Sequence, residues 1–192
     1  MPKGRLEAFT DAIIAIVMTV LVLNLHEPGS GDFSALLSEW QRLAIYVVSF
    51  LMLAIYWNNH HHLLQAAHTV NGKVLWTNNF FILSLSIFPF VTSWMGDYYY
   101  DLAPQLSFGV MILIADIMFF VLAHSLHHAA RANKDVAVFF SGYFKVWVSI
   151  GANVVALVLG ALILPELVFI VNVFMLVMWV VPEKRVEHLA GL

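Results

Sequence analysis

A few oxygen-bearing side chains interrupt a strongly apolar stretch near the start of the chain. This stretch runs from Leu6 to Leu25, and it contains Asp11, Thr19 and Asn24. Ionisable groups at membrane depth are costly and usually functional, and oxygen atoms can replace the hydration shell of a permeating cation. These residue types therefore indicate a helix that lines an ion pathway.

The spacing of this stretch places one hydroxyl among branched aliphatic side chains. At about 100° per residue of an ideal helix, one face carries Ile16, Thr19, Val20 and Leu23, with Ala12 and Arg5 extending it. A symmetric ring of such helices would form a hydrophobic constriction with one polar layer, and such constrictions gate by dewetting. The same spacing is also the ordinary packing face of a helix, so spacing alone leaves both interpretations open.

Asp11 needs a partner outside its own helix. It lies six residues after Arg5, so the two side chains point about 120° apart. We expect the partner on another helix near the cytoplasmic boundary, and the candidates are Asn58, Asn59, His60, His61, His62, Trp76, Asn78 and Asn79. The alternative is that Asp11 lies at the headgroup level and is solvated.

The nine histidines offer a different chemistry. His124, His127 and His128 match the H-x-x-H-H box with which membrane desaturases hold two irons, and imidazole suits iron. Such enzymes carry three boxes, whereas the second cluster here is three consecutive histidines, His60 to His62. A di-iron membrane enzyme is therefore one alternative, zinc at His124 and His128 is another, and hydrogen bonding at a helix end is the structural interpretation.

Asp116 suggests a third function. It lies near the middle of a long apolar segment, where it should be neutral, paired or facing water. Asn153 and Asn172 lie at comparable depth in later segments and are its expected partners. A proton-coupled transporter would use such an acid, whereas an interhelical hydrogen bond would be purely structural.

The composition places all of these residues in a membrane protein. The chain is 61% hydrophobic and 11% charged, whereas soluble domains are about a quarter charged. It contains no cysteine, which excludes disulfides, thiolate metal sites and cysteine nucleophiles. The fold class is therefore all-α, within a membrane.

Six apolar segments are each roughly long enough to span a bilayer. They are Leu6–Leu25, Phe33–Trp57, Val74–Met95, Ala103–Leu126, Val146–Leu164 and Glu166–Val181. Pro165 predicts a tight turn before the last segment, and Pro182 ends it. Residues 1–192 are predicted to form a single six-helix transmembrane channel domain.

Basic residues predict the orientation of these segments. With a cytoplasmic N-terminus, the inner side carries Lys3, Arg5, Lys73, Arg131, Lys134, Lys145, Lys184 and Arg185. Only Arg42 falls outside, which is a strong positive-inside bias. Both termini are then cytoplasmic.

The first segment carries a recognisable signature. Arg5-x-x-x-Phe9-Thr10-Asp11 resembles the Arg-x-x-x-Phe-Ser-Asp signature of the transmembrane protein 175 family, the endosomal/lysosomal potassium channels, with Thr10 where serine is usual. The run Ile16-x-x-Thr19-Val20-x-x-Leu23 and the patch from Trp57 to His62 are also similar. The number and order of segments agree over essentially the whole chain.

This resemblance implies a prokaryotic member, which carries one six-helix repeat and assembles as a homotetramer whose first helices line the pore. By position, Ile16, Val20 and Leu23 match the hydrophobic constriction. Thr19 matches the hydroxyl layer implicated in preferring potassium over sodium.

We therefore expect a passive, potassium-preferring cation channel in the cell inner (plasma) membrane. Arg5, Phe9, Thr10 and Asp11 would brace the inner end of the first helix. No catalytic residue, metal or cofactor is expected, and potassium is the permeant ion. The expected partners are identical subunits, monovalent cations and the bilayer, and not nucleic acid. The alternatives are the Asp116 transporter and the histidine-box enzyme.

Overall fold

All regular secondary structure in the described residues is helical. The computed structural model describes residues 3–67, 69–129 and 144–180. Its helices are α1 (Lys3–Leu23), α2 (Phe33–Ser38), α3 (Trp40–Ala66), α4 (Gly72–Ser86), α5 (Phe88–Asp97), α6 (Leu102–Ala129), α8 (Phe144–Leu162) and α9 (Leu167–Val180). The predicted all-α class is confirmed.

Several helices are long and apolar enough to cross a membrane. In the described part of the chain these are five segments, Lys3–Leu23, Trp40–Gln65, Gly72–Asp97, Leu102–Ala129 and Lys145–Leu162. Residues Leu167–Trp179 of α9 are apolar but shorter. A multi-pass membrane protein is therefore confirmed, and a sixth crossing by α9 stays a prediction. The turn at Pro165 is confirmed, since α8 ends just before it and α9 begins just after it.

The second predicted segment differs from the structure at both ends. Instead of one helix from Phe33 to Trp57, a short α2 is followed by α3, which continues to Ala66. The break falls at Glu39, whose carboxylate pairs with Arg42 at 2.6 Å, while Arg42 also pairs with Asp97 at 2.8 Å. The helix continues past Trp57 because the polar residues that follow find partners within the bundle, as described below.

The third predicted segment, Val74 to Met95, is broken into α4 and α5 at Ile87. Pro89 explains the break, because proline has no N–H and its ring excludes the carbonyl of the residue four positions earlier. The break also gives α1 a contact, since Asn24 Nδ2 donates to the Pro89 carbonyl at 3.3 Å.

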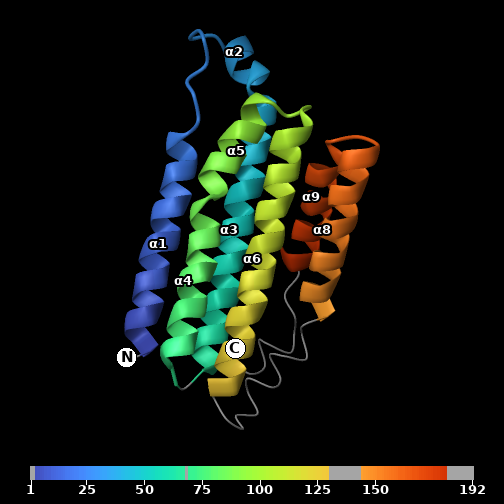
Figure 1. The fold of residues 1–192 in the computed structure, drawn as a ribbon. Coiled ribbons are helices and arrows are strands. Elements are labelled where there is room, and N and C mark those ends of the chain that lie inside the picture. The colour runs from blue at the N-terminus through green and yellow to red at the C-terminus, as the bar shows by residue number, and fades with distance from the viewer. Residues whose placement is uncertain (1–2, 68, 130–143, 181–192) are drawn as a thin grey trace.

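The helices form a bundle with α1 on one side and the α8–α9 hairpin on the other (Figure 1). Helix α1 contacts α3, α4 and α5, whereas α6 packs against α4, α5, α8 and α9. The core is rich in phenylalanine, and Phe81, Phe88 and Phe108 are fully buried. Helices α6 and α9 come close at Gly109, where a Cβ atom would lie 2.6 Å from Val168 Cγ1.

The described basic residues divide between the two ends of the bundle. Helices α1, α4 and α8 all start at one end, and their first turns carry Lys3, Arg5, Lys73 and Lys145. Helix α3, which carries Arg42, starts at the other end (Figure 1). This division agrees with the predicted orientation. Arg131, Lys134, Lys184 and Arg185 lie outside the described residues, as do Pro182, His68 and His188.

Candidate pore-lining face and the contacts that position it

Helix α1 has two faces with different surroundings. Its inward face is Leu6, Thr10, Ile14, Val17 and Leu21, all of which are buried against the other helices. Its outward face is Arg5, Phe9, Ala12, Ile16, Thr19 and Leu23, all of which are exposed in the single subunit. Leu21 is 2% exposed and Leu23 is 78% exposed, although only one residue separates them.

The predicted pore residues lie together on or beside the outward face. Ile16 is 58% exposed, Thr19 and Leu23 are exposed as well, and Val20 is half-buried at the edge of the face. Thr19 Oγ1 donates to the Ile16 carbonyl at 2.7 Å. Because its only proton is used within the helix, the hydroxyl presents oxygen lone pairs to its surroundings. Such an oxygen can coordinate a cation or accept a hydrogen bond.

A buried polar chain ties the inward face to two other helices. Asn78 Nδ2 on α4 donates to Thr10 Oγ1 at 2.8 Å, and Asn78 Oδ1 lies 2.8 Å from His60 Nε2 on α3. All three residues are fully buried. The amide oxygen is an acceptor, so this contact fits the His60 tautomer that carries its proton on Nε2. We call Thr10, Asn78 and His60 the Thr10 network, and it fixes α1 against α3 and α4.

Asp11 finds its partner on α3, but not among the predicted candidates. Trp57 Nε1 donates to Asp11 Oδ1 at 2.9 Å. The Trp57 ring stacks on His61, and His61 Nδ1 lies 3.2 Å from Glu7 Oε1. The prediction that Asp11 finds its partner on another helix is confirmed. The predicted residues were wrong, because the rotation of α3 turns the Trp57 indole toward α1. His61 and Glu7 complete a second set of contacts between α1 and α3.

Arg5 and Phe9 share a face, as their spacing predicts, but it is the outward face. Phe9 is 48% exposed, and Arg5 forms no hydrogen bond or ion pair within residues 3–67, 69–129 and 144–180. Of the four signature residues, Thr10 and Asp11 therefore make the contacts between helices. A bracing role for Arg5 and Phe9 stays a prediction.

Asp116 lies in the interior of the bundle with a partner that the sequence reasoning missed. Tyr56 on α3 donates its hydroxyl to Asp116 Oδ1 at 2.6 Å. The expected partners bond elsewhere, since Asn153 Nδ2 donates to the Gly109 carbonyl and Asn172 Nδ2 to the Val168 carbonyl. The pairing of Asp116 with these asparagines was wrong, because each amide instead satisfies a backbone carbonyl close to it. The sequence did offer Tyr56 as a candidate partner, since it directly precedes the patch from Trp57 to His62.

The histidine cluster on α6 does not assemble a metal site within the described residues. His124 and His128 lie on one face, with their Nε2 atoms 3.0 Å apart. In that part of the chain, no three histidine or carboxylate residues are placed to hold a metal ion. The histidine clusters at His60–His62 and His124–His128 lie on α3 and α6 as separate groups with separate partners.

Comparisons with known proteins find relatives that cover most of the chain. The sequence model of the family described as "Endosomal/lysosomal potassium channel TMEM175" matches residues 5–89. A protein of Chryseobacterium sp. (strain P1-3) that is named a potassium channel is 32% identical over 187 residues, which is 97% of each chain. A Gallus gallus protein named an endosomal/lysosomal proton channel is 21% identical over 145 residues, or 70% of this chain and 28% of its own.

A solved structure shares the fold. The crystal structure of a lysosomal potassium-selective channel TMEM175 homologue from Chamaesiphon minutus superposes with a TM-score of 0.80. The match covers 93% of this chain and 96% of the other, at 24% sequence identity. The likeness therefore extends over most of the chain and not only over the signature in α1.

Proposed function

Because the chain belongs to the TMEM175 family of potassium channels, we propose that it conducts potassium in preference to sodium through a pore formed by the α1 helices of a homotetramer. It is a multi-pass membrane protein of a channel family, and it is not an enzyme. The proposed location is the plasma membrane, with both termini in the cytoplasm.

The observation that carries this proposal is the outward face of α1. The inward face is buried within the subunit, while Ile16 and Leu23 are 58% and 78% exposed. The exposed face includes a hydroxyl at Thr19. A ring of four identical faces would enclose a narrow passage in which each subunit supplies the same side chains at the same depth.

The residue types on this face suit passive cation conduction. Ile16, Val20 and Leu23 would narrow the passage and gate it by dewetting. Thr19 would contribute a ring of hydroxyl oxygens, and its proton is already donated to the Ile16 carbonyl. Oxygen lone pairs that face the axis stabilise a partly dehydrated cation. The preference for potassium would arise at this layer.

The Thr10 network and the Asp11–Trp57 contact would hold this face in place. Both join the inner half of α1 to helices of the same subunit. A pore-lining helix needs such support because small displacements of a constriction change its width. Arg5, at the inner end of the same face, would attract anions and repel cations unless it is paired within the assembled channel.

Ion flux in proteoliposomes tests the proposal. Wild-type protein should release potassium faster than sodium down matched gradients, without any need for a proton gradient. Ile16→Ala should change the rate or the preference, whereas Ile170→Ala on α9 serves as a matched control at a position that is 42% exposed. Because the animal relatives are named proton channels, the assay includes a proton gradient. No flux of potassium, or flux only of protons, would contradict the proposal.

A further inference from the structure

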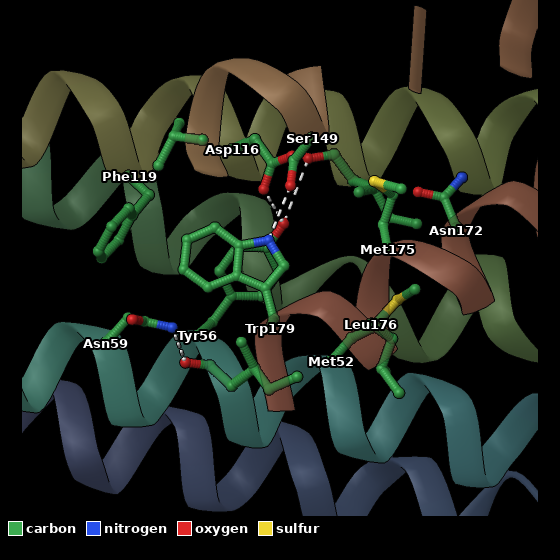
Figure 2. A pocket seen from close by; sticks show the side chains of 13 residues that line it. Met52, Tyr56, Asn59, Asp116, Phe119, Ser149, Asn172, Met175, Leu176 and Trp179 are labelled. Atoms are coloured by element: carbon green, nitrogen blue, oxygen red, sulfur yellow. Dashed lines mark hydrogen bonds between the residues drawn. The ribbon is translucent and has the colours of Figure 1, made fainter. Parts of the chain in front are cut away.

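A cavity of about 50 Å³ lies away from α1, among α3, α6, α8 and α9. Its polar lining residues are Tyr56, Asn59, Asp116, Ser149, Asn172 and Trp179, and no residue of α1 contributes to it (Figure 2). The cavity is therefore separate from the face assigned to the pore. Its volume suffices for a small ion or one to a few waters, since a water needs roughly 10–15 Å³ measured in this way.

The hydrogen bonds around the cavity engage its tyrosine and tryptophan donors and leave oxygen lone pairs on their acceptors. Tyr56 donates to Asp116 at 2.6 Å, and Trp179 Nε1 donates to Ser149 Oγ at 2.7 Å. Asn59 Nδ2 donates to the carbonyl of Ile55 at 2.8 Å, four residues earlier in its own helix.

Asn172 repeats this arrangement on α9, where its Nδ2 donates to the Val168 carbonyl at 2.8 Å. With one N–H of each amide bonded to the backbone, the amide oxygen and the second N–H remain for other partners. Figure 2 shows the Asn172 oxygen on the side of Asp116.

The cavity also holds one acid without a counter-charge. Asp116 is 9% exposed, and none of the ion pairs among the described residues includes it. Among the residues that the structure describes, no lysine, arginine or histidine lines the cavity. Lys145 Nζ lies 5.9 Å from the centre of the Trp179 ring, but Lys145 is not a lining residue. A carboxylate in a membrane interior requires compensation by a cation or a proton.

From this geometry we propose that the cavity binds a small monovalent cation, potassium or ammonium, at a site off the pore axis. Asp116 supplies the single negative charge, which matches a monovalent ion. The oxygens of Asn172 and Ser149 supply neutral ligands, as hard oxygen donors do for such ions. The small volume excludes cations with bulky organic substituents.

Thermal unfolding of the detergent-solubilised wild-type protein tests this site. Potassium, ammonium and N-methyl-D-glucamine chlorides are compared at constant ionic strength, since the last cation is too large to enter. A small cation should raise the melting temperature in a saturable manner. The ion with the lower half-saturating concentration identifies the natural occupant. Identical melting in all three salts would mean that Asp116 holds a proton instead, and it would overturn the proposal.

Variants separate this cavity from other places where cations bind. Asp116→Asn should abolish the shift. Asp101→Asn removes an exposed acid outside the cavity, and this variant should retain the shift in melting temperature. Thr19→Val removes the proposed pore hydroxyl and should also retain the shift, so this result does not depend on the proposed channel function. A shift that persists unchanged in Asp116→Asn would overturn the proposal.

A milder variant guards against the possibility that Asp116→Asn does not fold. Asn172→Leu keeps the acid and removes one neutral ligand. We expect the half-saturating cation concentration to rise about tenfold, the effect of losing one good polar contact. An unchanged half-saturating concentration in this variant would contradict the assignment of Asn172 as a ligand and, with it, the proposed site.

Discussion

The two faces of α1 carry similar apolar residues but stand in opposite environments. The inward face is buried and joined by the Thr10 network to α3 and α4. The outward face is exposed and ends in Leu23, which is 78% exposed. The difference indicates that the inward face stabilises the subunit, whereas the outward face is left exposed for the assembly and conduction that we propose. Substitutions on the two faces should therefore change different properties.

Two leucines provide the largest contrast. Leu21→Ala should lower the free energy of unfolding by about 2–4 kcal/mol, because it removes a fully packed side chain and leaves a cavity. Leu23→Ala should change it by no more than about 0.5 kcal/mol and should instead alter cation flux. Reversible unfolding in mixed micelles and proteoliposome flux measure the two properties. Equal losses of stability would contradict the division between the faces.

Breaking the Thr10 network should cause the second-largest loss of stability. Asn78→Ala removes both hydrogen bonds of the network and leaves Thr10 and His60 buried without this partner. We expect a loss of about 1–3 kcal/mol in the free energy of unfolding. Asn79→Ala, at the exposed neighbouring position, is the matched control and should be nearly neutral. A neutral result for Asn78→Ala would show that the network does not stabilise the subunit.

The contact between Trp57 and Asp11 should contribute less. Trp57→Phe keeps an aromatic ring to stack on His61 but removes the indole N–H that donates to Asp11. We expect a loss of about 1 kcal/mol in the free energy of unfolding. Trp76→Phe changes a tryptophan that is 66% exposed, and it provides the control in the same unfolding experiment. Equal effects of the two substitutions would argue against the Asp11 contact.

Thr19→Val should have the smallest effect on stability and a clear effect on selectivity. Valine has nearly the same shape as threonine, and the lost hydrogen bond is a local one to the Ile16 carbonyl. The free energy of unfolding should change by less than about 0.5 kcal/mol. The ratio of potassium to sodium flux should fall, because the ring of hydroxyl oxygens is lost. An unchanged ratio would remove Thr19 from the selectivity mechanism.

Much of the fold follows from hydrophobic length along the chain. The first and fourth segments were predicted within a few residues of α1 and α6, since long apolar runs have clear ends. The break at Ile87 could have been inferred from Pro89. The break at Glu39 has no proline to mark it, and the ion pair beside it joins Arg42 to Asp97, which lies 55 residues later in the sequence.

Only part of the candidate site could be predicted, because periodicity groups residues on a helix face but does not say what that face contacts. Helical periodicity placed Ile16, Thr19 and Leu23 on one face, but both faces of α1 are apolar, so periodicity could not say which face is buried. The partners of Asp11 and Asp116 depend on the rotation of α3. Adjacent residues on a helix point about 100° apart, and Trp57 and Tyr56 are adjacent. Such a rotation is fixed only by packing against other helices.

The central claim is that the outward face of α1 lines the conduction pathway, and cysteine modification tests it most directly. The natural chain has no cysteine, so Leu23→Cys introduces a unique thiol for a water-soluble, positively charged thiol reagent. Ile163→Cys, at a position that is 64% exposed beyond the end of α8, is the control. We predict that the reagent suppresses potassium flux through Leu23→Cys and leaves the control unchanged. Full flux through a Leu23→Cys protein whose thiol is completely modified would contradict the claim.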